Sequence, residues 1–185
     1  QSNIVGYYDK PDRNLVANAP PCRKTAFTEK QIEKWDNSIP FIKAMDKMFK
    51  KLNPIEYKKQ RQRAKKNNFH IKNTAFSTVT INNNWQTALH MDDGDFKEGF
   101  GNLCVVEKGD YKGGYTGFPQ FGVAANVRTG DYLSMDVHQW HCNTPLKGKK
   151  FNRLSLVAYL RENMIKCNKK TKKCTKRYKK SKKKI

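Results

Sequence analysis

Residues 130–145, with the sequence GDYLSMDVHQWHCNTP, contain the pattern on which the fold assignment depends. Gly130 belongs to a turn signal, and the residues from Tyr132 to Asp136 then alternate, as is typical of a β-strand. His141 follows this strand, and Pro145 ends the extended segment four residues later. The stretch therefore predicts a strand that leads into a turn and presents a histidine beside it.

Other segments with the same two-residue period lie on both sides of this stretch. The period of two begins at Phe69, after which alternating and β-branched residues replace a helical pattern. Turn signals at residues 113–114, 129–130 and 145–149 separate the segments. Several short strands at this spacing favour a sandwich or a barrel over βαβ units. The expected strands are residues 76–81, 102–107, 115–118, 122–127, 132–136 and 153–160.

A helical period precedes the strands. Apolar residues recur at spacings of three and four from Ile32 to Leu52, which predicts an amphipathic helix, and Thr28 is expected to cap the N-terminus of this helical region. Pro54 suits the first turn of a second helix, because the N–H that proline lacks has no partner there. Residues 56–66 are dense in Lys, Arg and Gln. We expect this second helix either to be solvated or to face phosphates.

The length of the chain limits the number of domains, and its charge indicates the kind of partner. Its 185 residues suffice for one compact domain and are too few for two ordinary enzyme domains. Residues 1–27 are rich in Pro, Asn and Gly and are expected to form an extended arm that lies on that domain. The net charge is +22, and 12 of the 38 Lys and Arg residues lie in residues 163–185, which contain no acid. The body therefore carries +10 and this tail +12. Both parts attract a polyanion such as nucleic acid, although the tail also fits a solvated segment that serves solubility or targeting.

Membrane spans and disulfide frameworks are not expected. The longest apolar runs, such as residues 154–160, are far shorter than the roughly 20 residues that cross a bilayer, and residues 1–20 have no signal-peptide pattern. We therefore expect a soluble, intracellular protein. The five cysteines are an odd number without paired spacing, so reduced thiols are expected rather than a disulfide framework or a zinc ribbon.

The four histidines supply the candidate metal ligands. In the segment His90-Met91-Asp92, two potential ligands at i and i+2 project to the same face of an extended strand. Their Cα atoms are then about 6.5 to 7 Å apart. This short pattern is weak alone, and His141 completes it. Two imidazoles and one carboxylate fill one face of an iron(II) octahedron and leave three positions open for an oxo-acid and dioxygen. His138 is the rival for the distal ligand; otherwise it orients the ligand shell or lies at the surface.

Arg153 is the candidate anchor for a carboxylate. It lies twelve residues after His141 on the next expected strand. A guanidinium is always charged and presents a planar fork, so a buried arginine on this strand is suited to bind the distal carboxylate of 2-oxoglutarate bidentately. Ser155, at i+2, is expected to add a hydrogen bond. Arg161 is the competing arginine, and it also fits an exposed position at the end of the strand.

Several of these motifs together resemble the TET/JBP family of DNA-base dioxygenases. The segments at residues 4–8 (IVGYY) and 22–28 (CRKTAFT) are similar to the entry of that catalytic domain. The separation of about fifty residues between the H-x-D motif and the distal histidine is similar to that of the family's smaller members. The motifs that carry the resemblance are residues 89–96 (LHMDDGDF), 99–103 (GFGNL), 113–114 (GG), 130–132 (GDY), 138–141 (HQWH) and 153–157 (RLSLV).

The resemblance implies a fold and a domain organisation. The fold class is α+β, mainly β: a double-stranded β-helix (jelly roll, cupin-like) with the N-terminal helices packed on one sheet. Residues 1–162 form a single dioxygenase domain, with the arm and helices in residues 1–68 and the β-helix core in residues 69–162. Residues 163–185 are expected to form a Lys-rich flexible tail.

The resemblance also implies a reaction. Iron(II), 2-oxoglutarate and O2 oxidise the 5-methyl group of thymine or 5-methylcytosine in DNA, in one or more steps. In duplex DNA the target base must be flipped out of the stack to reach the metal. We expect a monomer that binds duplex DNA, has no membrane partner and is nuclear if the source is eukaryotic.

Substrate-binding residues follow from the same resemblance. Tyr159 resembles the family's aromatic stacking residue, and Asp95 resembles its reader of the base edge; they also fit a core aromatic and a loop acid. Arg161 stands where some members have a histidine, which leaves the preference for cytosine open. Asn102 is expected to supply an amide to the oxo-acid or to the flipped base. The Asn82–Asn84 run is either a second source of amides or a turn, and we prefer the turn.

Two other functions remain possible from the sequence. A protein or small-molecule hydroxylase would use the same iron scaffold, because the fold does not choose the substrate. A nucleic-acid-binding jelly roll without turnover would keep the fold and the charge. The three aromatic residues Trp85, Phe118 and Trp140 are expected in the core rather than on a stacking surface.

Overall fold

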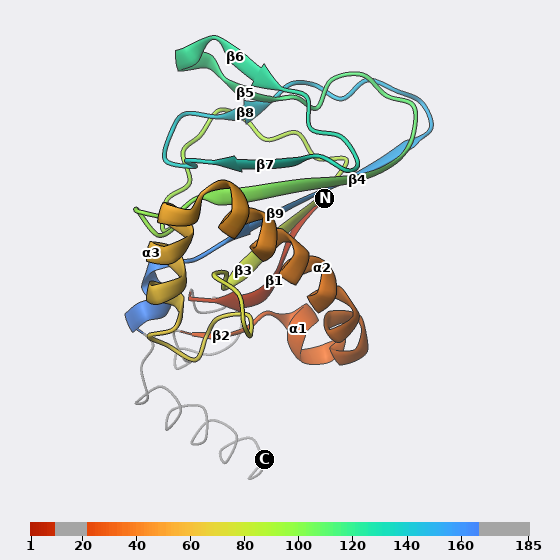
Figure 1. The fold of residues 1–185 in the computed structure, drawn as a ribbon. Coiled ribbons are helices and arrows are strands. Elements are labelled where there is room, and N and C mark those ends of the chain that lie inside the picture. Colours follow the sequence, from red (N-terminus) through yellow and green to blue (C-terminus); the bar gives the residue numbers. More distant parts are fainter. Residues whose placement is uncertain (10–21, 167–185) are drawn as a thin grey trace, which may run out of the picture.

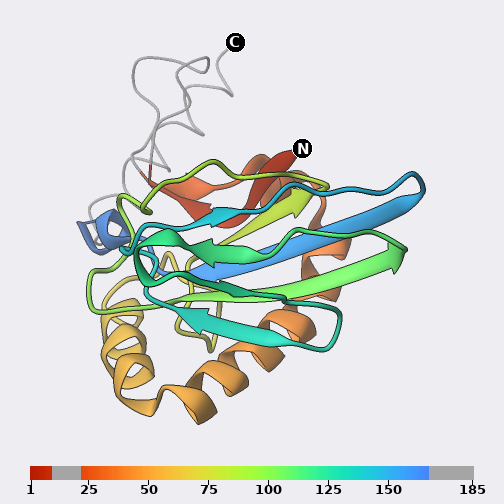
Figure 2. The same ribbon diagram turned by 90° about the horizontal axis from the view of Figure 1, so that it is seen from above.

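Two antiparallel sheets form the body of the protein in the computed structural model, which describes residues 1–9 and 22–166. Figure 1 shows the smaller sheet above the larger one, and the view from above in Figure 2 shows the smaller sheet lying over it. The larger sheet has the spatial order β2 (Arg23–Lys24), β1 (Ser2–Tyr8), β3 (Thr78–Asn83), β9 (Phe151–Tyr159), β4 (Gly101–Gly109) and β7 (Tyr132–Met135). The smaller sheet has the order β6 (Val123–Ala125), β5 (Thr116–Phe118) and β8 (Cys142–Asn143).

The strand β9 at the centre of the larger sheet shows how the sequence period sets the two faces. Because side chains alternate along a strand, Arg153, Ser155 and Val157 share the face that looks toward the smaller sheet. Leu156 and Ala158 lie on the opposite face, where they pack with the helices. The register with β3 and β4 carries this division across the sheet.

Helices cover the face of the larger sheet that is turned away from the smaller sheet (Figure 1). They are α1 (Ala26–Lys30), α2 (Ile32–Leu52) and α3 (Pro54–Ala64). The α2 residues Ile42, Met45 and Phe49 are at most 2% exposed and pack against the sheet in the main core. The amphipathic period of α2 and the Pro54 start of α3 are thus as the sequence predicted. Two short 3-10 helices, η1 (Pro119–Phe121) and η2 (Glu162–Lys166), complete the elements.

The expected N-cap at Thr28 is wrong. Thr25 caps α1, because its side chain accepts a hydrogen bond from the backbone N–H of Thr28. Thr28 instead lies inside α1, where its Oγ1 accepts from the Gly6 N–H at 2.7 Å and so joins the helix to β1. The N-cap of the helical region therefore lies three residues before the predicted cap at Thr28.

The mainly β architecture that the sequence predicted is confirmed, with the helices on one sheet. Within the described residues, no helix is long and apolar enough to cross a membrane. Cys22 is disulfide-bonded, so the expectation of reduced thiols is wrong for this residue, whereas Cys104 and Cys142 are free. Cysteine spacing alone does not show which thiols meet in space. Residues 167–185, most of the expected flexible tail, lie outside the described residues.

Candidate active site

The H-x-D motif lies on an extended segment, residues 87–92, that runs beside β8. The backbones of His90 and His141 exchange two hydrogen bonds, of 3.0 and 2.9 Å, and the Asn143 N–H donates to the Thr87 carbonyl. The Asp92 N–H donates to the Val137 carbonyl at 2.9 Å. This pairing explains why His90 and Asp92, which are two residues apart, meet a third ligand about fifty residues away in the sequence.

The side chains of His90, Asp92 and His141 converge at one point. Each offers one ligand atom, and these atoms lie within 4.8 Å of one another. The His90 Nε2 is 3.2 Å from an Asp92 carboxylate oxygen, and the two imidazole centroids are 4.3 Å apart. Such a set, two imidazoles and one carboxylate gathered on one side, matches the facial triad of an iron(II) oxygenase site.

Backbone carbonyls orient both imidazoles. The His90 Nδ1 lies 2.8 Å from the Ala88 carbonyl, and the His141 Nδ1 lies 2.8 Å from the Gln139 carbonyl. Since a carbonyl oxygen only accepts, each Nδ1 carries the proton, and in the neutral ring each Nε2 has a free lone pair. The donor set therefore fits a divalent metal ion.

His138, the rival for the distal ligand, lies outside this cluster. Its Nδ1 is 3.0 Å from a carboxylate oxygen of Asp136, which also accepts from the His138 backbone N–H. Among the described residues, the three that gather as metal ligands do not include it. The structure therefore favours His141, in agreement with the preference drawn from the sequence.

Arg153 is a buried cation without a carboxylate partner among the described residues. It is 2% exposed; its Nη2 donates to the Gly114 carbonyl at 3.1 Å, and its Nε has no hydrogen-bond partner. The buried Oγ1 of Thr116 also lacks a partner. An uncompensated buried charge is unfavourable by several kcal/mol. The carboxylate of a bound ligand would remove about this penalty by pairing with the guanidinium. These orphaned groups fit the distal carboxylate of an oxo-acid.

A cavity of about 260 Å³ between the two sheets connects these groups. Arg153, Ser155, Thr116 and Asn143 line one end of it, which we call the carboxylate end. The three predicted ligands also border the cavity. The opposite end, which we call the base end, is lined by Tyr159, Asp95 and Arg161.

Three polar side chains at the base end are almost fully buried. An isolated bridge joins Asp95 to Arg161, and their side chains lie 4.0 Å apart. The Arg161 Nε donates to Asp9 at 2.5 Å, and its guanidinium lies over the Tyr8 ring. The Tyr159 hydroxyl is 3.1 Å from the Thr80 hydroxyl. Arg161 is therefore a buried cavity residue and not an exposed end of a strand.

Burial raises the pKa of Asp95 to about 8, and the nearby Asp92 adds to this shift. The Arg161 guanidinium opposes it without cancelling it. Desolvation penalises the charged form of a carboxyl group in this way whenever water is excluded. Asp95 therefore accepts hydrogen bonds when ionised and gains a donor when protonated.

Asn102 lies on the other face of the sheet, which contradicts its expected role as an oxo-acid ligand. It pairs with Ala158 and is 0% exposed, and its amide donates to the carbonyls of Phe100 and Ala158. Its Oδ1 accepts from the hydroxyls of Tyr132 and Ser134. All of these partners belong to the protein, so the amide holds β4, β7 and β9 together.

The aromatic residues that were expected in the core are more exposed than predicted. Trp85 is 46% exposed and lines the cavity, and Trp140 is 45% exposed, so the prediction is wrong for both. Phe118 is partly buried, with its ring 6.3 Å from that of His141. Asn84, which precedes Trp85, forms the preferred turn at φ 45° and accepts a hydrogen bond from the Arg153 N–H at 2.7 Å. This turn places Trp85 at the carboxylate end.

The sequence did not assign two contributors, Thr116 and Gly114, to the site. Thr116 comes from a strand of three residues, and its position beside Arg153 depends on how the two sheets stack. Gly114, at φ 72°, approaches Arg153 so closely that a Cβ there would lie 3.2 Å from its Nε. A pair of glycines indicates a turn, but not which side chain the turn must accommodate.

The arrangement defines a class of protein. An open triad between the sheets of a jelly roll, beside a buried arginine with no carboxylate partner, is typical of iron(II)- and 2-oxoglutarate-dependent oxygenases. The Tet_JBP family model, the oxygenase domain of the 2OGFeDO superfamily, matches residues 3–162. The chain belongs to this family, as its motifs predicted.

Similar proteins agree with the assignment. The bifunctional helicase and thymine dioxygenase JBP2 of Trypanosoma cruzi (strain CL Brener) is 36% identical over 171 residues, which are 89% of this chain and 15% of that protein. The thymine dioxygenase JBP1 of Trypanosoma brucei brucei is 36% identical over 164 residues, which are 86% of this chain and 19% of that protein. The chain thus spans less than a fifth of either relative.

A solved structure supports the fold. The structure of NgTET1 in complex with 5mC DNA superposes with a TM-score of 0.68 at 13% sequence identity. The match covers 88% of this chain and 61% of that one. At this identity the likeness is one of fold, and it confirms the jelly roll with its helical layer.

Proposed function

We propose that this protein oxidises the 5-methyl group of thymine in DNA, using iron(II), 2-oxoglutarate and O2. The observation that carries the proposal is the joining of the triad and the uncompensated Arg153 in one cavity. The curated relatives at 36% identity, both thymine dioxygenases, favour thymine as the base. The positive charge of the chain suits a nucleic-acid substrate. A DNA substrate also favours an intracellular location, nuclear in a eukaryote, and a monomer suffices for the site.

The carboxylate end would bind and orient the co-substrate. Arg153 provides the charge and a planar fork for the distal carboxylate, and its Nε and the Thr116 hydroxyl are free to donate to it. Ser155, 6% exposed on the same strand face, provides a third donor. Because these groups are already desolvated, little reorganisation is needed on binding.

The triad would hold the metal ion. The Nε2 atoms of His90 and His141 and one oxygen of Asp92 are the donors, and the carbonyls behind each Nδ1 keep the rings in place. When bound, iron(II) with 2-oxoglutarate and O2 supplies the oxidation: the oxo-acid is decarboxylated to succinate, and one oxygen atom is inserted into a methyl C–H bond. The protein itself positions the methyl group and excludes water.

The base end would receive the thymine. A base inside a duplex cannot reach a cavity between two sheets, so it must be flipped out of the stack. The Arg161 guanidinium offers donors to the thymine carbonyl oxygens, and the Asp95 carboxyl group offers an acceptor to N3–H. The Tyr159 ring, on the same wall, provides an aromatic surface for stacking.

One observation supports 5-methylcytosine as an alternative to thymine. The NgTET1 structure with a similar fold contains 5mC DNA. A cytosine would also satisfy the pair at the base end, with its amino group donating to Asp95 and its ring nitrogen accepting from Arg161. 5-Methylcytosine is therefore the second candidate substrate.

Mass spectrometry of nucleosides tests the proposal. The protein is incubated with iron(II), 2-oxoglutarate and DNA that contains either thymine alone or 5-methylcytosine, and hydroxymethylated nucleosides and succinate are measured. We expect 5-hydroxymethyl-2′-deoxyuridine from thymidine. His90→Ala and Asp92→Ala are expected to abolish it, whereas His138→Ala, outside the triad, is expected to retain turnover. Succinate release that responds to peptides and not to DNA would replace the proposal with a protein hydroxylase, and no release at all would leave a binding module.

A further inference from the structure

A second hollow, of about 560 Å³, lies on the outside of the base end. One side is formed by α3 and the turn after it, with Lys59, Arg63 and Lys66. The loop 96–98 and Glu162 form the other side. We call this hollow the α3 groove. The proposed reaction uses none of its residues.

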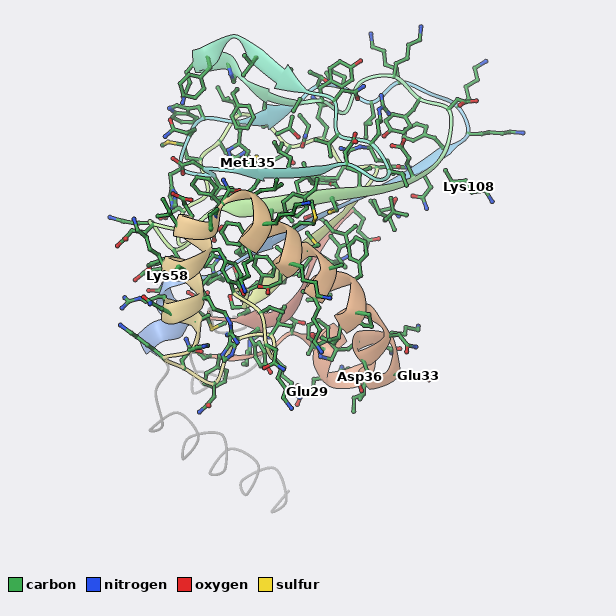
Figure 3. The ribbon with its side chains drawn as sticks, in the orientation of Figure 1. Glu29, Glu33, Asp36, Lys58, Lys108 and Met135 are labelled. Atoms are coloured by element: carbon green, nitrogen blue, oxygen red, sulfur yellow. The ribbon has the colours of Figure 1, made fainter. Side chains whose placement is uncertain are left out.

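The segment that follows the first turn of α3 is uniformly basic, and Glu56 in that first turn is the one acid of the helix. From Tyr57 to Lys66 the sequence has six Lys and Arg residues and no acid. In Figure 3, Lys58 extends outward from α3, whereas Glu29, Glu33 and Asp36 lie around α1 and the start of α2. The acids of the helical layer that this view labels are thus at the end away from α3. Three cations of the segment 57–66, Lys59, Arg63 and Lys66, line the α3 groove and so lie beside the base end.

Four cations face the α3 groove and only two acids. Glu98 pairs with Lys59 at 3.4 Å, and Glu162 pairs with Arg63 at 2.9 Å. Lys66 and Lys97 take part in none of the ion pairs found among the described residues. Two lysines whose charge is not compensated line a hollow, and a hollow of this kind is complementary to anionic groups.

The α3 groove and the base end share a wall. Asp95 lines the cavity, and the next residue, Phe96, lines the groove; likewise, Arg161 lines the cavity and Glu162 lines the groove. The Phe96 N–H donates to the Leu160 carbonyl at 2.8 Å, which ties the two sides of this wall together. A polymer with one unit in the base end therefore meets the groove at its neighbouring units.

We propose that the α3 groove binds the phosphate backbone of the DNA strand on one side of the flipped nucleotide. The proposal rests on the proposed function, because it takes DNA as the substrate. A phosphodiester chain carries one negative charge per nucleotide, and each lysine that reaches a phosphate releases condensed counterions. The groove binds phosphates irrespective of sequence and holds the strand in register, while the base end contacts the base.

Paired charge reversals test the proposal. Lys66→Glu/Lys97→Glu alters the two lysines of the groove without breaking a described ion pair. Lys43→Glu/Lys47→Glu, two exposed lysines of α2, is the matched control with the same change in net charge. Binding of a fluorescent DNA duplex to the full chain is measured by polarisation between about 50 and about 200 mM salt, the range over which phosphate contacts dominate the salt dependence. Melting temperatures show whether each variant is folded, and Lys66→Gln/Lys97→Gln repeats the test with a smaller perturbation.

The groove variant is expected to bind DNA at least tenfold more weakly in the lower salt range, with the slope of log affinity against log salt reduced by about 2 for two lost phosphate contacts. The loss should be the same for unrelated sequences, and the α2 control should change affinity by less than about threefold, since it removes no phosphate contact. Equal losses in the two pairs, or no loss in either, would overturn the proposal. Binding is read without turnover, so failure of the groove and failure to oxidise DNA are separate results.

Discussion

Replacing Arg153 with methionine should separate the two consequences of a buried charge. Methionine fills a similar volume without the guanidinium. In the protein without co-substrate, Arg153 is 2% exposed and, among the described residues, its guanidinium donates one hydrogen bond, to the Gly114 carbonyl. Removing the charge therefore removes a desolvation penalty and leaves one carbonyl without a partner. We expect the free energy of unfolding to change by between zero and a gain of about 3 kcal/mol.

Co-substrate binding should change in the opposite direction. Truncating one partner of a buried, hydrogen-bonded charge pair costs about 2 to 5 kcal/mol, which corresponds to a rise of roughly 30- to 5,000-fold in the KM for 2-oxoglutarate. The KM for DNA should not follow, because Arg153 lies at the carboxylate end and the base end is formed by other side chains.

Thermal unfolding measures both effects. At a co-substrate concentration of about 100 times Kd, ligand binding should stabilise the wild-type protein by about 2.7 kcal/mol, a rise of roughly 5 to 11 °C in Tm for a chain of this size. Mn²⁺ replaces iron so that no turnover occurs. Arg153→Met should lose this rise. Arg128→Met is the control, because Arg128 is paired with Glu107 at 3.7 Å and does not line the cavity. If Arg153→Met lowers the Tm of the ligand-free protein by several degrees and keeps the KM, Arg153 is a structural residue and the assignment is wrong.

Three further sets of substitutions test the base end, the glycine turns and the structural role of Asn102. The folded-state pKa of Asp95, about 8, lies above its ordinary value of 3.8, so the folded protein holds a proton that the unfolded chain releases, and stability contributed by Asp95 is lost as the pH rises through this window. The urea midpoint of Asp95→Asn should therefore rise relative to that of the wild type as the pH goes from about 5 to about 8. A difference between the two midpoints that stays constant with pH would contradict the raised pKa. Gly113→Ala should destabilise by several kcal/mol, because its Cβ would lie 1.8 Å from a carbonyl oxygen, whereas Gly122→Ala, with nothing within 4 Å, should lose only about 1 kcal/mol of left-handed backbone strain; equal losses in denaturant titrations would refute the steric reason. Asn102→Ala should lower stability by about 2 to 4 kcal/mol with an unchanged KM for 2-oxoglutarate, and Ser155→Ala should do the reverse, with a loss below about 1 kcal/mol and a raised KM; the opposite pattern would restore Asn102 as a ligand.

The parts of the site that the sequence predicted are those with a short-range signal. The spacing of His90 and Asp92 places both on one face of an extended segment whatever the rest of the chain does. His141 and Arg153 follow from strands with a clear period of two. In each case the residue type is rare in this chain or chemically specific, so few other residues were candidates for the same role. The structure brings the three ligands together and leaves Arg153 buried beside them.

The parts that the sequence did not predict depend on pairing between distant strands. Asn102 and Leu103 are neighbours in β4, and only the register with β9 shows that Leu103 faces the cavity and Asn102 the helices. Thr116 is the converse case: it lines the same cavity as Arg153 because the smaller sheet stacks over the larger one. A shift of one residue in the assumed pairing exchanges the two faces, so a period of two without a register cannot assign a residue to a site.

Exposure of the aromatic residues was mispredicted for a related reason. Large aromatic side chains dominate cores, and by that rule Trp85 and Trp140 belong inside. Trp85 instead follows a left-handed turn at Asn84, whose side chain is held by the backbone of β9. The turn directs the chain away from the core at this point. Such a turn is visible in the sequence as a run of asparagines, but its direction is not.

The central strand β9 sets the separation between the two ends of the cavity. Arg153 and Tyr159 are six residues apart on one face of this strand, so their Cα atoms are about 20 Å apart, and no side-chain rearrangement alters this distance. The same strand packs against the helices through Leu156 and Ala158 on its other face. A substitution that disturbs this packing, such as Ala158 to a larger residue, would displace the carboxylate end and the base end together, because the backbone of β9 positions residues at both ends. The position of a methyl group relative to the triad is therefore a property of the sheet and its helical layer, and not only of the residues that touch the substrate.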